Sequence, residues 1–429
     1  MIDRSISPKT KRIDSVKIDE PVQNTLDNGI NYNGFYSANA PVIKLDMIFR
    51  AGVEYQNSAL QSVFSNSLLK EAPLGKNPDE VAEFFDYYGS FVETFSGAEL
   101  SGLRLFVPTK DFDKVIPLFS DLIINPSLPE NEFKILKKKY YSSIQNNMKK
   151  TKYVAMRGLN LELFGDKHQL GYFVQADDAN NVKLESLNEF ISEHYTSNNC
   201  QIQIAGQYDD NILNLLNKYF GNIRDGRFWK NKSILSQNKN VSGEKNKIKV
   251  YDFKDAVQST IYGGTFIDIK SDEDLILMGI LNTVFGGYFG SRLMKNIRED
   301  KGYTYGIGSF VTEYSDRTLL RVVSDVGVDV TKSAISEVYN EIDLLLSKPV
   351  PESELKLVKN YMMGELISSL DGVIPTSMVF EKLIPRSRTK DFIDQNIELI
   401  NSIDSKTLHK FALDKLKPDE FTFVVAGKY

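Results

Sequence analysis

The chain contains an internal repeat. Gly89-Ser-Phe-Val-Glu-Thr-Phe-Ser96 returns as Gly308-Ser-Phe-Val-Thr-Glu-Tyr-Ser315, at an offset of 219 residues. Three further matches keep the same order at offsets of 217, 222 and 221, namely Leu103-Arg104 with Leu320-Arg321, Asn125–Glu132 with Ser347–Glu354, and Ile204–Gly206 with Val425–Gly427. Chance similarity between strand ends would not keep four matches in order at nearly constant spacing. The repeat therefore predicts two copies of one domain in tandem.

Each copy mixes short strands with amphipathic helices. In the first copy, alternation of apolar and polar residues in Val42–Phe49 predicts a half-buried strand. A helical pattern covers Asn57–Lys70, and Pro78–Tyr88 predicts another helix. Hairpin-like strands combined with helices favour an α+β fold. We expect two homologous α/β-sandwich halves, each a mainly antiparallel sheet with helices on one face.

Composition marks the boundary between the copies. Between Arg224 and Asn246 the sequence shifts to Lys, Asn, Ser and Gly, with Trp229 as a large anchoring side chain. Such a stretch is typical of a linker. The predicted organisation is a first half at residues 1–223, a linker at 224–246 and a second half at 247–429. The first 20 residues are polar and predict a loosely held arm.

One segment of the second half places two functional side chains near each other. An apolar helix at Leu275–Phe285 is expected to end at the glycine pair 286–287, which tolerates positive φ. A second helix, Ser291–Arg298, and a strand carrying Tyr305 follow. A tight turn between them would bring the Arg298 guanidinium near the Tyr305 phenol. The alternative is a structural one, in which Arg298 merely stabilises a helix C-terminus and Tyr305 packs under it.

The run Ser291-Arg-Leu…Ile297-Arg298-Glu-Asp-Lys-Gly-Tyr-Thr-Tyr305 resembles the C-terminal half of insulinase-type metallopeptidases, the pitrilysin and mitochondrial processing peptidase-like family. In that family an Arg and a Tyr with this spacing reach a substrate held on zinc. With the repeat, the resemblance extends over nearly the whole chain. It implies two halves facing each other across a cavity, like a clamshell.

The resemblance also exposes a departure from the family. Members that cleave peptides carry the inverted zinc motif H-x-x-E-H on a helix of the first half, with a distal Glu as third ligand. Alignment on the apolar pattern of the helix puts the motif positions at Ser62, Ser65 and Asn66. The distal position falls on Ser143, whether it is counted from the motif or from the downstream Leu163-Phe164. Small neutral residues thus replace all four zinc-site groups, and no metal is expected in this chain.

The remaining reactive side chains offer no other catalytic centre. The three histidines, His168, His194 and His409, lie too far apart in sequence to form a metal motif, and each reads as a packing or surface residue. Cys200 opens an apolar strand and reads as a buried small hydrophobe. The sequence contains neither a G-x-S-x-G nucleophile elbow nor a P-loop.

Charge and hydropathy exclude further classes. The net charge of −5 gives no basic field for nucleic acid or an anionic membrane. No run of about 18 apolar residues occurs, so no membrane span is expected. The N-terminus lacks the apolar stretch of a signal peptide, and a single cysteine excludes an internal disulfide framework. These features predict a soluble, cytoplasmic protein.

Within the resembling family, some peptidases pair a zinc-bearing chain with one that contributes the Arg and Tyr. The leading hypothesis is therefore a non-catalytic subunit, inactive alone, that contributes Arg298 and Tyr305 in trans to a homologous H-x-x-E-H partner acting on short unfolded peptides. Zinc is then expected in the partner only. A structural or assembly protein of the same fold, or a module that binds peptides without cleavage, remains the alternative. The open edge of the strand at Ser90–Phe95 is a further candidate for lining the peptide chamber.

Overall fold

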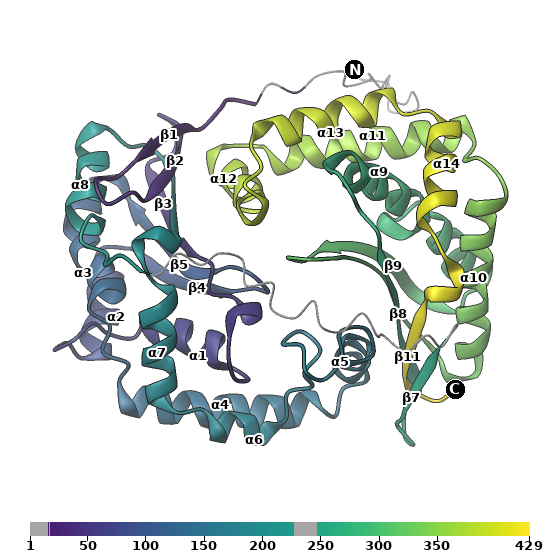
Figure 1. The fold of residues 1–429 in the computed structure, drawn as a ribbon, viewed down its shortest axis with the longest axis horizontal. Helices are drawn as coiled ribbons and strands as arrows, with labels where there is room; N and C mark the ends of the chain where they lie inside the picture. Colours follow the sequence, from purple (N-terminus) through teal and green to yellow (C-terminus); the bar gives the residue numbers. More distant parts are fainter. Residues whose placement is uncertain (1–15, 17, 227–246) are drawn as a thin grey trace, which may run out of the picture.

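The computed structural model describes residues 16, 18–226 and 247–429. Two β-sheets stand on opposite sides of the molecule, and helices surround them (Figure 1). Residues 22–206 supply the first sheet and residues 248–427 supply the second. Most of the predicted linker, residues 227–246, lies outside the described residues.

The strands occupy the following ranges. The first sheet contains β1 (Val22–Thr25), β2 (Asn31–Tyr36), β3 (Val42–Phe49), β4 (Phe91–Ser96), β5 (Ser101–Pro108) and β6 (Cys200–Gly206). The second sheet contains β7 (Ile248–Asp252), β8 (Gln258–Ile267), β9 (Thr304–Glu313), β10 (Thr318–Gly327) and β11 (Thr422–Gly427).

The helices follow the same division. Those of the first half are α1 (Gln61–Leu69), α2 (Pro78–Tyr87), α3 (Phe112–Ile124), α4 (Glu130–Asn147), α5 (Thr151–Phe164), α6 (Ala176–Asn181), α7 (Leu184–His194) and α8 (Asp210–Phe220). Those of the second half are α9 (Asp272–Asn282), α10 (Thr331–Ser347), α11 (Glu352–Ser369), α12 (Val373–Glu381), α13 (Lys390–Ser402) and α14 (Ser405–Lys415).

Apart from the additional edge strand β1, the two sheets share one topology. The first has the order β1-β2-β6-β3-β5-β4 and the second β7-β11-β8-β10-β9. In each, one pair is parallel (β2 with β6, β7 with β11) and the others are antiparallel. The predicted fold class, two mainly antiparallel sheets with helices, is confirmed.

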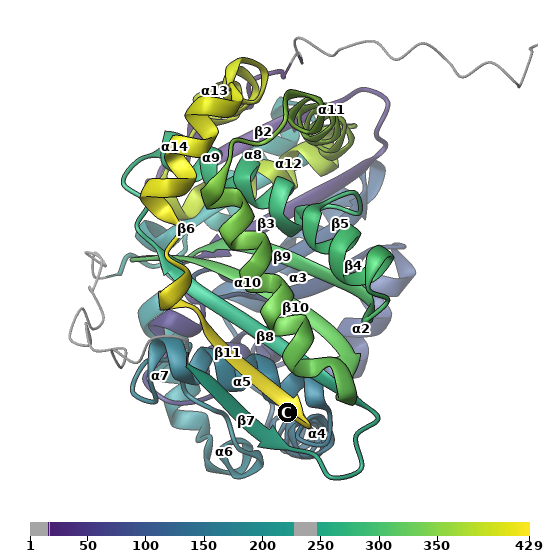
Figure 2. The ribbon, with the colours of Figure 1, turned by 90° about the vertical axis from the view of Figure 1, so that its right-hand side faces the viewer.

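The outer face of each sheet carries a hydrophobic core. In β3, Ile43, Leu45, Met47 and Phe49 alternate onto this face and are fully buried with residues of the first half's helices. In the second half, α10 runs across the outer face of its sheet (Figure 2). This face is the one that the period of two in each strand predicts.

The inner faces are covered by an exchange of helices that the sequence did not indicate. Helix α5 of the first half packs on the second sheet, where Leu159 and Leu163 join a buried cluster with Tyr262 and Val424. Helix α12 of the second half packs on the first sheet, and its Phe380 meets Phe35 edge to face with ring centroids 5.2 Å apart. Figure 1 shows α5 beside β11 and α12 beside β2. Each half thus completes the other.

The two exchanged contacts differ in chemistry. The contact of α5 is mainly apolar, with an ion pair between Glu162 and Lys247 at 2.8 Å. In contrast, α12 covers the buried charges of Lys44 and Asp46 on β3. Asp46 accepts hydrogen bonds from Lys44 and from Arg104 Nε, the latter at 2.6 Å. Arg104 also donates to Glu381 of α12 at 2.6 Å. These four residues are called the interhalf charge cluster below.

The prediction that the strand at Val42–Phe49 is only half-buried is wrong, because the interhalf charge cluster buries its polar face. Alternation predicted that one face of this strand meets solvent, but Lys44 and Asp46 are both 0% exposed. Burial lowers the pKa of Lys44 and raises the pKa of Glu381, because desolvation disfavours the charged form of each. A polar position in a strand can therefore face another half of the same chain.

The last residues of the predicted N-terminal arm depart from the prediction. Residues 1–15 and 17 lie outside the described residues, but Ile18 is buried in the core of the second half, and Val16 packs against the same cluster. Residues 22–25 then form β1 on the first sheet. The chain from Ile18 to β1 thus joins the second half to the first and is not loosely held.

Glu54 is a buried carboxyl near the contact between the halves. It lies in the short 3₁₀ turn Val53–Tyr55, is 8% exposed, and its Oε1 has no hydrogen-bond partner among the described residues. Burial raises its pKa; a hydrogen bond from Ser315 and the charge of Arg386 oppose this, while Glu99 and Asp316 reinforce it. Since the folded-state pKa is raised, neutral Glu54 favours folding at low pH, and this contribution is lost as pH rises through the folded-state pKa.

We therefore expect Glu54→Gln to be more stable than the wild type at pH about 7 and to lose this advantage at pH about 3, which lies below the unfolded-state pKa and where the carboxyl is protonated in both states. Urea unfolding of both proteins across this range measures the difference. An advantage for Glu54→Gln that does not change with pH would contradict the assignment.

No helix among residues 18–226 and 247–429 is long and apolar enough to cross a membrane.

Candidate functional site

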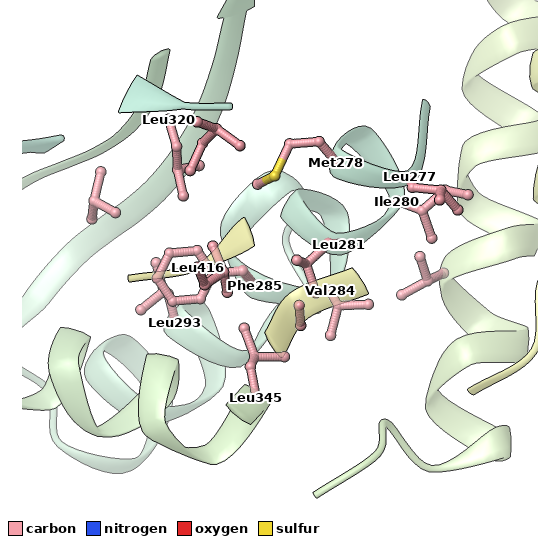
Figure 3. Close-up of a cluster of buried hydrophobic side chains, with 14 of the residues drawn as sticks. Leu277, Met278, Ile280, Leu281, Val284, Phe285, Leu293, Leu320, Leu345 and Leu416 are labelled. Carbon is pink, nitrogen blue, oxygen red and sulfur yellow. The ribbon is translucent and has the colours of Figure 1, made fainter. Parts of the chain in front are cut away.

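The segment that carries Arg298 is fixed to the core of the second half. Helix α9 passes into a π-helical segment, Thr283–Gly287, and a second π-helical segment, Met294–Asp300, holds Arg298. Phe285 and Leu293, from these two neighbouring stretches, point into one buried cluster with Leu320 of β10 (Figure 3). The predicted inward face of the second helix, which includes Leu293 and Ile297, is buried. The wider π turns were not predicted.

The backbone of this segment packs closely against β9 at Gly286. A Cβ at Gly286 would lie 2.5 Å from Ser309 Oγ, so only glycine fits there without a shift. Asn282 Nδ2 donates to the Ser309 carbonyl at 3.2 Å. Because β9 also carries Tyr305, these contacts fix the strand relative to the helical segment.

The structure brings Arg298 and Tyr305 together. The Arg298 guanidinium carbon lies 5.7 Å from the centre of the Tyr305 ring and 4.4 Å from the centre of the Phe289 ring. Tyr305 is 92% exposed, and Arg298 is half-buried. The alternative in which the phenol packs under a helix end is therefore wrong. Both side chains are open to a ligand.

The three predicted motif positions on α1 lie together but in a hydrogen-bond network. Ser62 Oγ donates to the Ala51 carbonyl at 2.6 Å and lies 3.1 Å from Ser96 Oγ. Asn66 Nδ2 donates to the Phe95 carbonyl of β4 at 2.7 Å. All three positions, Ser62, Ser65 and Asn66, are buried.

The network uses both ends of the Asn66 amide. Its Oδ1 accepts a hydrogen bond from the Tyr195 hydroxyl at 2.9 Å, and burial raises the pKa of Tyr195. Ser65 Oγ approaches the Leu187 carbonyl at 3.5 Å. The replaced positions thus connect α1 to β4 and α7.

The fourth position does not join this network. Ser143 is exposed on α4, and its Oγ accepts from Asn147 Nδ2 at 3.4 Å. Helix α4 does cross α1, where Tyr140 and Phe64 pack with ring centroids 4.9 Å apart. These hydroxyl and amide groups do not fit zinc, which prefers thiolate, imidazole and carboxylate ligands.

The histidines and the cysteine hold structural positions. His168 Nδ1 accepts from the Leu170 backbone N–H at 3.1 Å, and burial lowers its pKa. His194 is fully buried with Nδ1 3.1 Å from the Arg50 carbonyl oxygen, and His409 Nε2 lies 3.0 Å from the Leu346 carbonyl oxygen. Burial raises the pKa of the Cys200 thiol. Among the described residues, no group of three or more His, Cys, Asp and Glu side chains could hold a metal ion.

A separate cavity of about 770 Å³ lies between the halves. Arg298 and Tyr305 do not line it. It is lined by the β1–β2 hairpin, the start of β6 and residues 380–389, and its amide side chains are Gln23, Asn24, Asn31, Asn33, Asn198, Asn199 and Gln201. Among the described lining residues there are two arginines and no carboxylate. This cavity could not be predicted from the sequence, because its lining comes from five separate segments.

Strand β4 forms one edge of the first sheet. It pairs with β5 on one side and is the last strand in the sheet order on the other. Phe91 at its start is 50% exposed. The predicted open edge near residues 90–95 is therefore present, at Phe91–Ser96.

Comparison of the sequence with known families and proteins finds similarity to peptidases and their inactive relatives. The family model described as peptidase M16 inactive domain matches residues 181–362. An uncharacterized zinc protease of Bacillus subtilis, YmxG, is 24% identical over 76% of this chain and 79% of its own length. The mitochondrial-processing peptidase subunit alpha of Rattus norvegicus is 19% identical over 81% of this chain and 71% of its own length.

A solved structure shows the same fold. The crystal structure of a peptidase M16 inactive domain from Pseudomonas fluorescens superposes with a TM-score of 0.83 and 17% identity, and covers 95% of this chain and 98% of that chain. The chain thus has the fold of that solved structure, and residues 181–362 match the model of the peptidase M16 inactive domain.

Proposed function

We propose that this chain is the non-catalytic subunit of a heteromeric M16 peptidase, to which it contributes Arg298 and Tyr305. The observation that carries the proposal is an asymmetry within one chain. The α1 positions are buried, hydrogen-bonded to neighbouring segments and unsuited to zinc, whereas Tyr305 is 92% exposed beside Arg298. Packing within the chain explains why the α1 positions are kept as they are, but it does not explain an exposed Tyr305 beside Arg298.

The two side chains suit different parts of peptide cleavage. Attack on a peptide bond turns its carbonyl oxygen into an oxyanion, and a fixed O–H donor such as Tyr305 stabilises that charge as it develops. The Arg298 guanidinium offers several N–H donors in one plane, which suit a backbone carbonyl next to the cleaved bond. A homologous H-x-x-E-H chain would supply the zinc.

The expected substrates are short unfolded peptides, because an extended peptide can add to the open edge of β4 by backbone hydrogen bonds. The relative from Rattus norvegicus is by name one subunit of a processing peptidase, which supports a peptidase partner of homologous fold. A cytoplasmic location and the absence of membrane or nucleic-acid partners remain predictions.

A second candidate is peptide binding without cleavage. The cavity of about 770 Å³ between the halves favours it, because its amide side chains both donate to and accept from a peptide backbone. An assembly role of the same fold belongs with this candidate, since neither requires Tyr305 or Arg298.

Reconstitution tests the proposal. The chain is purified alone and with an H-x-x-E-H homologue from the same organism, and cleavage of a quenched fluorescent peptide library is recorded. We expect no cleavage by this chain, little by the homologue, and strong cleavage by the mixture. Equal cleavage by the homologue with and without this chain would reject the proposal.

A further inference from the structure

Phe289 occupies a position that burial does not explain. Its side chain is 64% exposed. The preceding Tyr288 packs against the core of the second half, and the centre of its ring lies 4.8 Å from the centre of the Tyr361 ring. The Ser291 N–H donates to the Tyr288 carbonyl at 3.1 Å and closes a turn at this point. The turn therefore buries one aromatic ring in part and leaves the next one outside.

The contact that Phe289 does make is with Arg298. The guanidinium carbon lies 4.4 Å from the centre of the Phe289 ring, within the range of a cation–π interaction and closer than the 5.7 Å to the Tyr305 ring. In the described part of the chain, the Arg298 side chain makes no hydrogen bond or ion pair that would compete with this contact. Aromatic rings are thus its neighbours.

Other arginines of the second half are held differently. Arg292, one helical turn and a half earlier, donates to both carboxylate oxygens of Glu354 at 3.0 and 2.9 Å. Arg388 donates to both oxygens of Glu313 at 2.6 and 2.8 Å. Such pairs fix a guanidinium but use its N–H donors. A ring face attracts the cation through its π electrons and leaves the donors in the guanidinium plane free.

We propose that Phe289 is a positioning residue that holds the Arg298 guanidinium in place while leaving its N–H donors free for a peptide carbonyl or carboxylate. The identity of that ligand rests on the proposed function, but the positioning itself does not. Phe289 follows the π-helical segment Thr283–Gly287, in which Gly286 fits closely against β9, so the turn that carries Phe289 and the strand that carries Tyr305 are held against each other.

A double-mutant cycle in the reconstituted complex tests the role. We expect Phe289→Leu to lower kcat/KM about three- to tenfold, because a cation–π contact and a fixed orientation are lost. Phe289→Tyr keeps a ring face and should recover most of the loss. In an Arg298→Ala background the same Phe289→Leu change should alter kcat/KM by less than about twofold. An equal loss in both backgrounds would show that Phe289 acts independently of Arg298 and would overturn the proposal.

A second measurement needs no partner. In the isolated chain labelled with ¹⁵N-arginine, the Nε–H resonance of Arg298 is identified by its absence from the Arg298→Lys spectrum. Phe289→Leu should shift this resonance by removing the ring current, Phe289→Tyr should leave it close to the wild-type position, and the Arg292 resonance serves as the unchanged reference. An Arg298 resonance that does not respond to Phe289→Leu would overturn the proposal. Failure of reconstitution with a normal ring-current result would reject only the proposed function.

Discussion

Tyr305→Phe lowers kcat of the reconstituted peptidase by about 100- to 1,000-fold, the loss typical for removal of one oxyanion donor. KM should change little, because the phenol donates to charge that develops only in the transition state. The substitution removes one hydroxyl from a side chain that is 92% exposed, so folding should be unaffected. Initial rates with a fluorogenic peptide, together with thermal unfolding of the isolated variant, measure both effects.

Arg298→Ala should act differently. A guanidinium that binds a backbone carbonyl equally in the ground state and the transition state contributes to KM and not to kcat, so we expect Arg298→Ala to raise KM more than it lowers kcat. Arg292→Ala serves as a control only for charge, since it breaks the pair with Glu354 and is expected to lower stability. Rates of the complex that are unchanged by both Tyr305→Phe and Arg298→Ala would reject the role in trans and favour the structural alternative.

Asp46→Asn destabilises the protein by about 3–5 kcal/mol, the cost of leaving buried charge without its partner. Asp46 is fully buried and accepts from both Lys44 and Arg104, so the change leaves two cations facing Glu381 alone. The free energy of unfolding from urea titration measures the loss. Because the interhalf charge cluster joins β3 and β5 to α12, we also expect the first unfolding transition to separate the halves.

Two further variants check this expectation. Combining Asp46→Asn with Lys44→Met restores the balance of charge and should recover part of the loss. Glu130→Gln removes one charge of an exposed ion pair with Lys134 and should cause no measurable change. A loss for Asp46→Asn as small as that of the surface variant would contradict the assigned role of the interhalf charge cluster.

Most of the fold could be predicted from the internal repeat. Four matches at nearly constant offset required two similar units, and, apart from β1, the two sheets share one topology. Individual elements followed from local signals, as for the strand at Val42–Phe49, which has the predicted bounds. Helix α2 starts at the predicted Pro78, where Asn77 caps it by accepting from the Asp79 N–H.

The relation between the units could not be predicted in the same way. Alternation with a period of two indicates that one face of a strand is polar. It does not indicate whether water or the other half of the chain covers that face. Lys44 and Asp46 therefore read as solvent-facing until α12 is placed over them. The exchange of α5 and α12 could not be predicted, because the apolar pattern of a helix does not state which of two sheets the helix packs on.

The candidate site was only partly accessible from sequence. The motif that resembles the insulinase-type family predicted that Arg298 and Tyr305 lie close together. Alignment of the helix α1 with the zinc motif of that family identified the substituted zinc positions. Phe289 was missed, since an exposed phenylalanine in a glycine-rich turn carries no periodic signal. Its contact with Arg298 depends on the path of the loop across the end of the helix.

The central claim is that this chain has no zinc centre of its own and acts only through a partner. The most direct test is the zinc content of the isolated, purified protein, measured together with its peptidase activity. We expect far less than one zinc per chain and no cleavage of unfolded peptides. Stoichiometric zinc accompanied by cleavage in the isolated chain would contradict it.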